Sequence, residues 1–141
     1  MKIYVASSWR NLLQTAMVPL LRGAGHDVYD FRNPPSGSGG FAWSDIDPNW
    51  ESWTAAEYRE ALKHPIAMEG FKSDIEALQQ CEACVLVLPS GRSASWEFGY
   101  AAGQGKLTAV IQFENCEPEL MYSGSEFLTT MDEVFDWAEK I

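Results

Sequence analysis

The feature that most constrains this fold is a short apolar strand followed by a turn-rich loop and a helix of small residues. The strand pattern covers Val85–Leu88, and the sequence PSGRS at residues 89–93 is typical of a loop. A helical pattern rich in Ala and Gly then begins near Ser95. This order predicts a helix N-terminus at the carboxyl end of a parallel strand, where free backbone N–H groups favour a polar ligand.

Strand and helix patterns alternate along the rest of the chain. Residues 2–6 and 26–30 have the pattern of buried strands. The segment between them has the apolar spacing of a helix, at Leu12, Leu13, Ala16, Met17, Leu20 and Leu21. Pro19 lies inside this pattern and predicts a kink or a helix boundary. A strand, a helix and a strand within about 30 residues predict a right-handed βαβ unit with parallel strands.

The later segments continue this alternation. Helices are predicted over residues 55–63 and from about Ser73 to Gln80, a strand over 107–113, a short strand near Phe127 and a final helix over 131–140. The whole pattern predicts one α/β domain over residues 1–141. Its expected architecture is a doubly wound, flavodoxin-like parallel sheet of about five strands, with helices on both faces and ligands at the carboxyl ends of the strands.

Composition and charge exclude several classes of protein. The formal net charge of -10 disfavours association with DNA or RNA, so no nucleic-acid polymer is an expected partner. No apolar run approaches the roughly 20 residues of a membrane span, and the N-terminal sequence lacks the pattern of a signal peptide. We therefore expect a cytoplasmic protein without a membrane partner. The sequence GYAAGQG lies within and after a helix instead of between a strand and a helix, so no nucleotide cofactor motif is present and no cofactor is expected.

The three cysteines do not predict a disulfide framework. Cys81 and Cys84 form a CxxC pair, a spacing that redox and zinc sites also use. Cys84 begins the apolar strand, and no second Cys or His pair stands nearby. Two core thiols are therefore the favoured interpretation, and no metal site is predicted.

Residues 32–54 form a long segment that is rich in Pro, Gly and Ser. A disordered linker would have few aromatic residues, whereas this segment contains Phe41, Trp43, Trp50 and Trp53. We interpret the segment as an ordered lid or insertion loop. Its rings either stack on a nucleobase, for roughly 1–3 kcal/mol each, or form a hydrophobic cluster or a subunit contact that holds the loop.

Four residues have both a structural and a functional interpretation from the residues alone. Glu97 falls in the predicted first turn of its helix, where it either complements the helix dipole, worth about 0.3–1 kcal/mol, or acts on a ligand. It does not complete a capping box from Ser93, because the spacing is four residues instead of three. Asp74 is either an N-cap or a catalytic carboxylate, and Tyr4 is either a core residue or part of a site. Arg10 either faces solvent or binds an anionic or polar ligand.

Two segments resemble the nucleoside 2-deoxyribosyltransferase family and the related 2′-deoxynucleoside 5′-phosphate N-hydrolases. They are IYVASSWRN at residues 3–11 and WEFGYAAGQGK at residues 96–106. In this family a glutamate followed by an apolar residue, Gly and an Ala-rich helix attacks the anomeric carbon of the sugar, and Glu97 is the matching position. The resemblance also implies that Asp74 is the second carboxylate and that Tyr4 holds the catalytic glutamate.

The resemblance implies that the protein cleaves or transfers the N-glycosidic bond of a nucleoside or deoxynucleoside through a covalent glycosyl-enzyme on Glu97. Three alternatives stay open: water or a second base as acceptor, a 5′-monophosphate as substrate, and a noncatalytic module that binds a nucleotide-derived molecule. The family completes each pocket from a neighbouring subunit, so a homodimer or higher homo-oligomer is expected. The expected substrate-binding residues are Ser7, Arg10, Phe41, Trp43, Ser90, Gly91, Arg92, Ser93, Ser95, Glu119 and Met121.

Glu119 departs from the family pattern. At the matching place before Leu120-Met121, the nucleotide hydrolases resemble one another in having a serine for the phosphate, and the transferases have an asparagine for the 5′-hydroxyl. Two like charges about 4 Å apart repel by roughly 1 kcal/mol in water and by several times more in a closed pocket. Glu119 therefore favours a nucleoside over its 5′-monophosphate, although Arg10 or Arg92 could offset the repulsion.

Overall fold

The computed structural model describes all 141 residues of the chain, which divide into two units. The first unit comprises residues 1–30 and 78–141, and the second comprises residues 31–77. The second unit extends beyond the predicted lid of residues 32–54, because it also contains one helix and most of the next.

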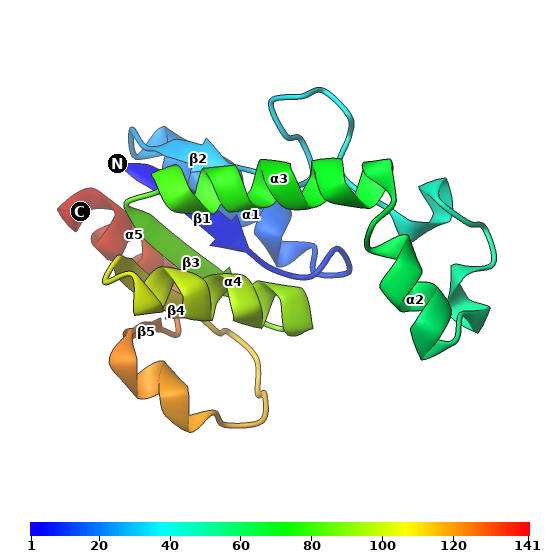
Figure 1. The fold of residues 1–141 in the computed structure, drawn as a ribbon. Coiled ribbons are helices and arrows are strands. Elements are labelled where there is room, and N and C mark those ends of the chain that lie inside the picture. Colours follow the sequence, from blue (N-terminus) through cyan, green and yellow to red (C-terminus); the bar gives the residue numbers. More distant parts are fainter. The chain divides into compact units, whose positions relative to one another are not determined.

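The first unit contains a five-stranded sheet in which all neighbouring strands are parallel (Figure 1). The strands are β1 Lys2–Ala6, β2 Asp27–Tyr29, β3 Ala83–Val87, β4 Leu107–Ile111 and β5 Glu126–Leu128. Their order is β2-β1-β3-β4-β5, which confirms the predicted flavodoxin-like architecture. In this order the connections lead away from the β1–β3 pair in both directions, so the carboxyl ends of β1 and β3 form the switch point where such folds bind ligands.

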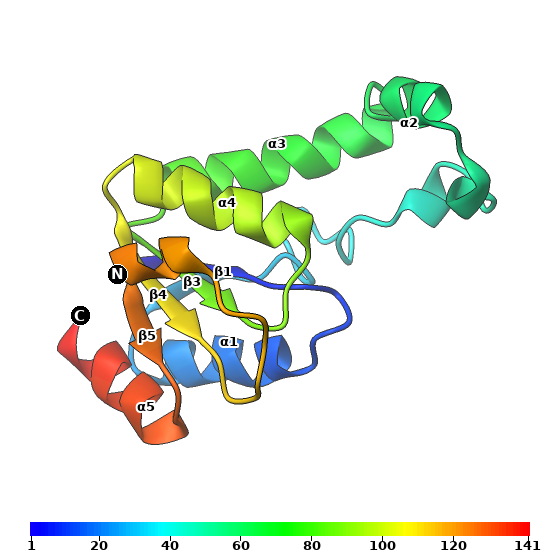
Figure 2. The same ribbon diagram turned by 90° about the horizontal axis from the view of Figure 1, so that it is seen from below.

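Helices of the first unit cover both faces of this sheet. The helices α1 Leu13–Gly23 and α5 Met131–Lys140 lie on one face, and α4 Arg92–Gly103 lies on the other (Figure 2). Ile3 and Val5 of β1 belong to the core that α1 and α5 form with the sheet. Because side chains alternate along a strand, Tyr4 points to the opposite face, which α4 covers.

The buried face of α1 differs from the predicted one. Leu12 and Ala16, which the apolar pattern placed on that face, are exposed, and Leu12 lies before the helix begins. A polar residue takes part in the buried stripe instead, because the Gln14 side chain donates a hydrogen bond to Asp30 Oδ1 at 2.8 Å. Pro19 lies inside the helix on its exposed side and does not end it. The buried residues of α1 are Gln14, Met17, Val18 and Leu21.

The second unit contains two 3-10 turns, η1 Trp43–Asp45 and η2 Trp50–Ser52, followed by α2 Ala55–Ala61 and α3 Pro65–Gln80. The last three residues of α3 belong to the first unit. The helix begins at Pro65 instead of near Ser73, because proline suits the first helical position, where its missing N–H has no helical partner to lose. The prediction that Asp74 begins this helix is therefore wrong, since Asp74 lies in its interior.

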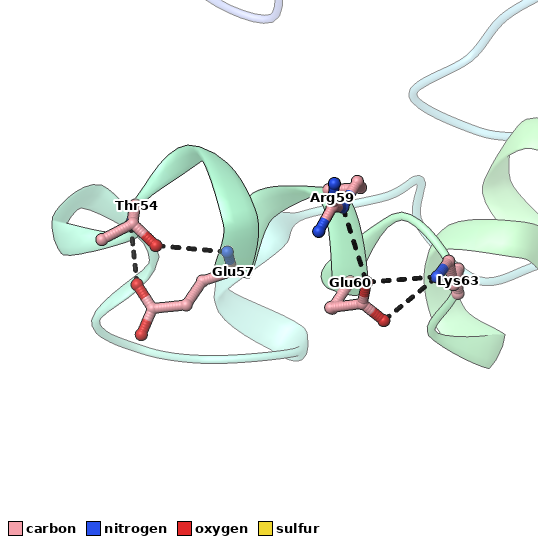
Figure 3. Close-up of polar contacts among 5 residues, drawn as sticks. All are labelled: Thr54, Glu57, Arg59, Glu60 and Lys63. Carbon is pink, nitrogen blue, oxygen red and sulfur yellow. Dashed lines mark hydrogen bonds and ion pairs between the residues drawn. The ribbon is translucent and has the colours of Figure 1, made fainter.

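A capping box defines the start of α2 (Figure 3). The Thr54 hydroxyl accepts a hydrogen bond from the Glu57 backbone N–H at 3.2 Å, and the Glu57 carboxylate accepts one from the Thr54 N–H at 2.7 Å. Further along, Glu60 pairs with Lys63 at 3.1 Å and with Arg59 at 3.6 Å. The exposed ion pairs contribute at most about 1 kcal/mol each. The cap is worth about as much and, in addition, fixes where the helix begins.

The end of the chain follows the prediction closely. A 3-10 turn, η3 Leu120–Gly124, precedes β5, and α5 has the predicted bounds. The strand predicted to reach residue 113 ends at Ile111, since residues 112–119 form a loop. No helix of the protein combines the length and the apolar character that crossing a membrane requires.

Candidate active site

The switch point of the sheet lies between two loops, residues 7–12 after β1 and residues 88–91 after β3. The Ser7 hydroxyl joins the first loop to the end of β3 by donating a hydrogen bond to the Val87 carbonyl at 2.8 Å. Six of the expected binding residues follow these two strands. The six are Ser7, Arg10, Ser90, Gly91, Arg92 and Ser93.

Glu97 lies in the second turn of α4, so the prediction that it occupies the first turn is wrong. Gly91 is the N-cap residue, with extended backbone, and the helix begins at Arg92 instead of near Ser95. No acidic residue lies in the first turn. Because the field of a helix terminus falls off within one turn, the helix dipole does not account for a carboxylate at position 97.

Glu97 instead occupies the side of α4 that faces the sheet. The buried residues of this helix are Ala94, Phe98 and Ala101, and Glu97 is three residues after the first and four before the last. The side chain of Glu97 is half-buried. Burial raises the pKa of the fully buried Cys84 thiol well above its ordinary value, and the charges of Cys81 and Glu97 raise the pKa further. The charge of Glu97 therefore influences the ionisation of a residue in β3.

Tyr4 occupies the same face of the sheet as Cys84 and α4. In the sheet, Tyr4 lies in register with Tyr29 of β2 on one side and with Cys84 of β3 on the other. Tyr4 is fully buried and stacks on Tyr29, with ring centroids 5.1 Å apart. The first unit thus brings Tyr4, Cys84 and Glu97 to one layer between the sheet and α4.

The polar side chains of the β3–α4 loop differ in exposure. Ser90 is half-buried, whereas Arg92, Ser93 and Ser95 are exposed. The Ser95 hydroxyl donates a hydrogen bond to the Gly91 carbonyl at 3.2 Å, so it is used within the helix start. Gly91 has an ordinary negative φ, and nothing would contact an added Cβ there. Neither backbone conformation nor steric crowding therefore requires a glycine at position 91.

Arg10 lies in the other loop and is exposed. Its backbone N–H donates a hydrogen bond to the Ser8 hydroxyl at 3.2 Å, which shapes the turn that carries it. The Arg10 guanidinium is therefore accessible to solvent and to a ligand at the switch point.

Glu119 and Met121 belong to a third loop, between β4 and β5. Glu119 is the N-cap of η3, and its charge adds to burial in raising the pKa of the Tyr122 hydroxyl. Both Glu119 and Met121 are exposed, Met121 to 81%, and Leu120 beside it is equally so. A long apolar side chain this exposed is available to a partner, as a subunit contact would require.

In the second unit, Phe41 and Trp43 are parts of an aromatic cluster. The Trp43 ring contacts Phe41, Trp53 and Tyr58 edge to face, with centroid distances of 4.7, 5.7 and 5.6 Å. Phe41 packs beside Gly70 of α3, where an added Cβ would lie 3.2 Å from the Phe41 Cβ and 3.3 Å from two of its ring carbons. One of the two sequence interpretations, a hydrophobic cluster that holds the loop, is therefore observed.

A hydrogen-bonded carboxylate fixes the same loop. Asp47 accepts hydrogen bonds from the Asn49 backbone N–H at 2.9 Å and from the Trp53 indole N–H at 2.8 Å. These bonds hold the pKa of Asp47 below its ordinary value, with the backbone bond as the larger cause. Asp74 lies elsewhere in this unit, half-buried within α3.

Asn11 has a central position that the sequence analysis missed. Its side-chain amide lies within hydrogen-bond distance of Ser7 Oγ and of the carbonyls of Val87 and Pro89, at 3.1, 3.2 and 3.2 Å. Its side-chain oxygen accepts a hydrogen bond from the Leu13 N–H at 3.0 Å. The signal available in the sequence was an Asn just before an apolar helix pattern, which is typical of a cap.

Cys81 and Cys84 are buried, as the core interpretation predicted. Cys81 and Cys84 are buried free thiols, and Cys116 is a half-buried one. The Cys81 thiol donates a hydrogen bond to the Leu78 carbonyl at 3.1 Å, which shows how a thiol is accommodated at the end of α3. No group of three or more His, Cys, Asp or Glu side chains is arranged to hold a metal ion.

Two solved structures share this fold. A 2-deoxyribosyltransferase from the psychrotolerant bacterium Bacillus psychrosaccharolyticus superposes with a TM-score of 0.63 at 19% sequence identity, over 96% of this chain and 91% of that one. The CMP N-glycosidase BcmB from Clostridium botulinum superposes with a TM-score of 0.50 at 12% identity, over 99% and 97% of the two chains. No protein-family model matches the sequence, and no curated protein matches it either. The fold is therefore shared with a glycosyl-transferring enzyme and an N-glycosidic hydrolase.

Proposed function

We propose that the protein cleaves or transfers the N-glycosidic bond of a nucleoside or deoxynucleoside, with Glu97 as the nucleophile. One observation carries the proposal. Glu97 is a half-buried carboxylate on the sheet-facing side of α4, in a fold shared with a 2-deoxyribosyltransferase and a CMP N-glycosidase. The charge of this carboxylate raises the pKa of the buried Cys84 thiol on the facing strand, and functional sites are where ionisable groups are held close to a protein interior.

The proposed reaction has two steps. In the first, a Glu97 oxygen attacks the anomeric carbon of the sugar, the carbon–nitrogen bond breaks, and its electron pair leaves with the base, which gains a proton. In the second, water or another base attacks the same carbon and displaces the Glu97 carboxylate, so the anomeric configuration is retained. Water makes the protein a hydrolase, and a second base makes it a transferase.

Asp74 is the proposed second carboxylate, which assists the leaving base or orients it. The support is the family resemblance together with the half-buried position of Asp74 inside a regular helix, where a capping role is excluded. Proton transfer by such a group typically contributes about 100- to 10,000-fold to a rate. Tyr4 is proposed to hold the Glu97 carboxylate in the orientation required for attack.

Two loops are proposed to bind the rest of the substrate. Residues at the switch point, among them Ser90 and Ser93, would hold the hydroxyl groups of the sugar, and Phe41 and Trp43 would contact the base. Glu119 is proposed to disfavour a 5′-phosphate, as argued from its charge. A second subunit is proposed to contact the exposed Met121 and complete the site.

The test is chromatography of nucleosides, deoxynucleosides and their 5′-monophosphates incubated with the protein, with and without an acceptor base. Intact-protein mass spectrometry then tests for the sugar adduct. We expect free base to be released and an adduct to form in the parent, and neither in Glu97→Gln. The matched control is Glu139→Gln, an exposed glutamate on α5, which should retain activity.

A rival outcome is recognised in the same experiment. Binding of a nucleoside without release of base, in both the parent and Glu97→Gln, would make the protein a binding module. A 5′-monophosphate preferred over its nucleoside tenfold or more in kcat/KM would overturn the role of Glu119 alone. Activity of Glu97→Gln within tenfold of the parent would overturn the nucleophile.

A further inference from the structure

The Asn11 carboxamide is a buried link between the two loops of the switch point. The residue is only 8% exposed, and its Nδ2 atom lies 3.1 Å from Ser7 Oγ, 3.2 Å from the Val87 carbonyl oxygen and 3.2 Å from the Pro89 carbonyl oxygen. The last two acceptors are 76 and 78 residues away in the sequence. One side chain therefore connects the loop after β1 to the segment that leaves β3.

The hydrogen-bond partners determine which way this carboxamide is oriented. The Leu13 backbone N–H can only donate, so the atom 3.0 Å from it must be Oδ1. The Val87 and Pro89 carbonyls can only accept, so the atom beside them must be the amide nitrogen. A carboxylate at this position would satisfy Leu13 but would place an oxygen against both carbonyls. The site therefore requires an amide and distinguishes it from an acid of the same shape.

The two ends of the Asn11 side chain perform separate tasks. Through Oδ1 it accepts a hydrogen bond from the first N–H of α1. This bond takes the place of a side-chain cap, which Leu12, the residue before the helix, does not provide. Through Nδ2 it holds two carbonyls at the carboxyl end of β3, next to Ser90 and Gly91. The direction in which the chain leaves β3, and hence the start of α4, is fixed by this second task.

Ser7 strengthens the same link. Its hydroxyl donates to the Val87 carbonyl at 2.8 Å and lies 3.1 Å from the Asn11 amide nitrogen, whose two hydrogens are shared among three acceptors. Val87 thus receives hydrogen bonds from two side chains of the opposite loop. A hydrogen-bonded group of this kind holds its members more firmly than separate pairs would.

We propose that Asn11 is a positioning residue for the active site, which locks the β3–α4 loop in the conformation that binds substrate. Asn11 acts through the Val87 and Pro89 carbonyls and does not itself touch the reacting atoms. The catalytic part of this inference rests on the proposed function, whereas the lock itself is a property of the fold that can be measured without turnover.

The proposal predicts a loss of catalysis larger than the loss of stability. Displacing catalytic or binding groups by about 1 Å can reduce a rate by about 100-fold. Asn11→Asp preserves the size of the side chain and the acceptor for Leu13, and it replaces the amide donor by a charged oxygen that faces Ser7 Oγ and the two carbonyls. We expect kcat/KM to fall by about 100-fold, mainly through KM, since the binding loop loses its fixed conformation.

The direct test is hydrogen–deuterium exchange of the free protein. In Asn11→Asp, amides of residues 88–95 and 8–13 should exchange faster than in the parent, while those of α5 should be unchanged. Gln79→Glu is the matched control, because it makes the same amide-to-acid change at an exposed position beyond the other end of β3. Equal exchange of residues 88–95 in Asn11→Asp and Gln79→Glu would overturn the lock.

Two further outcomes keep the lock and the reaction distinguishable. If the parent turns over no nucleoside or nucleotide while the exchange result holds, the proposed function fails and the lock stands. If exchange increases but kcat/KM stays within threefold of the parent, the lock exists and the positioning role is overturned.

For an Asn11→Asp chain that does not fold, the parent provides the test by NMR. The Asn11 side-chain amide protons should exchange with water more slowly than those of the exposed Asn49, and equal rates would overturn the lock.

Discussion

The starts of α2 and α5 differ from the start of α4 in how their backbone N–H groups are satisfied. Thr54 and Thr130 each accept a hydrogen bond from the backbone of the glutamate three residues later, and each glutamate accepts one in return. Gly91, before α4, has no side chain to offer, so no side-chain cap is present. Two helices therefore begin at closed caps and one begins at an open end.

The capped and uncapped helix starts are expected to matter for different properties, the first for stability and the second for function. A closed cap contributes about 1 kcal/mol and needs only local sequence, and neither capped helix directly follows β1 or β3, the two strands whose carboxyl ends form the switch point. The open start of α4 adjoins that point and is followed, one turn later, by the half-buried Glu97. Proteins break local rules mainly where function requires it. We therefore expect changes in α4 to affect activity and changes at the caps to affect stability.

The largest expected effect is on Glu97. Glu97→Gln should lower kcat by about 1,000-fold or more, because a neutral amide cannot form the covalent intermediate. The free energy of unfolding should change by less than about 1 kcal/mol, since the side chain keeps its shape and is only half-buried. Steady-state kinetics and urea denaturation measure the two quantities. A large loss of stability with activity retained would reverse the comparison and make Glu97 structural.

Asp74 should show the second largest effect. Asp74→Asn should lower kcat by about 100- to 10,000-fold for a substrate with a poor leaving base, because proton transfer to the base is lost. The loss should be smaller for a nucleoside whose base leaves readily as an anion. Asp136→Asn, at an exposed position of α5, is the control. Equal losses for both kinds of leaving base would argue against a role in proton transfer.

Trp43 tests the aromatic cluster of the second unit. Trp43→Ala removes three edge-to-face contacts, which are worth about 0.5–1.5 kcal/mol each beyond burial. We expect the second unit to lose about 1.5–4.5 kcal/mol of local stability, measured as faster hydrogen exchange in residues 41–58. Trp50→Ala is the control, because Trp50 has no ring contact of this kind.

The same tryptophans test whether the cluster also contacts the base. Addition of a nucleoside should change the tryptophan fluorescence of Glu97→Gln, and Trp43→Ala should weaken binding beyond its effect on local stability. Unaltered affinity in both Trp43→Ala and Trp50→Ala would show that the aromatic segment is scaffold only.

The sequence predicted the sheet well, because its strands are short apolar runs separated by helix patterns and the connection rules leave few topologies. The predicted bounds of α5 are correct, and the helix begins at a capping box that two residues close in sequence form, Thr130 and Glu133. The start of α4 was placed too late for the opposite reason. Gly91 has no side chain that signals a cap, and the first strong signal in the sequence is Ser95, whose hydroxyl in fact bonds back to the Gly91 carbonyl.

The contacts around the candidate site could not be predicted from local sequence. Asn11 bonds to carbonyls 76 and 78 residues away, and Gln14 is buried because Asp30 accepts its hydrogen bond. Both depend on the folded sheet, which brings the two loops together and places α1 beside the end of β2. The motif predicts Glu97 as a candidate residue, whereas its sheet-facing orientation depends on where α4 begins, which the motif does not specify.

A smaller effect compares the two kinds of helix start directly. Thr130→Ala should lower the free energy of unfolding by about 1 kcal/mol, because the Glu133 N–H loses its partner. Gly91→Ala should change it by no more than about 0.5 kcal/mol, since its φ is negative and an added Cβ meets no atom. Thermal and urea denaturation measure both. A loss at Gly91→Ala as large as that at Thr130→Ala would show that the open start is itself a structural requirement.

The smallest expected effect is the pH dependence of the two closed caps. Hydrogen bonds from the Thr54 and Thr129 backbones lower the pKa of Glu57 and Glu133 below their ordinary value of 4.5. A lowered pKa in the folded state means that the caps stabilise fully above about pH 4.5 and lose this contribution as the pH falls through the lowered value. The double variant Glu57→Gln/Glu133→Gln keeps the cap geometry but cannot titrate. The stability advantage of the parent over this variant should therefore be largest near pH 7 and shrink below pH 4.5, whereas Glu139→Gln, which changes a glutamate outside both caps, should show no such shrinkage. An advantage that stays constant from pH 7 to pH 3 would mean that the charge of these carboxylates is not part of the cap.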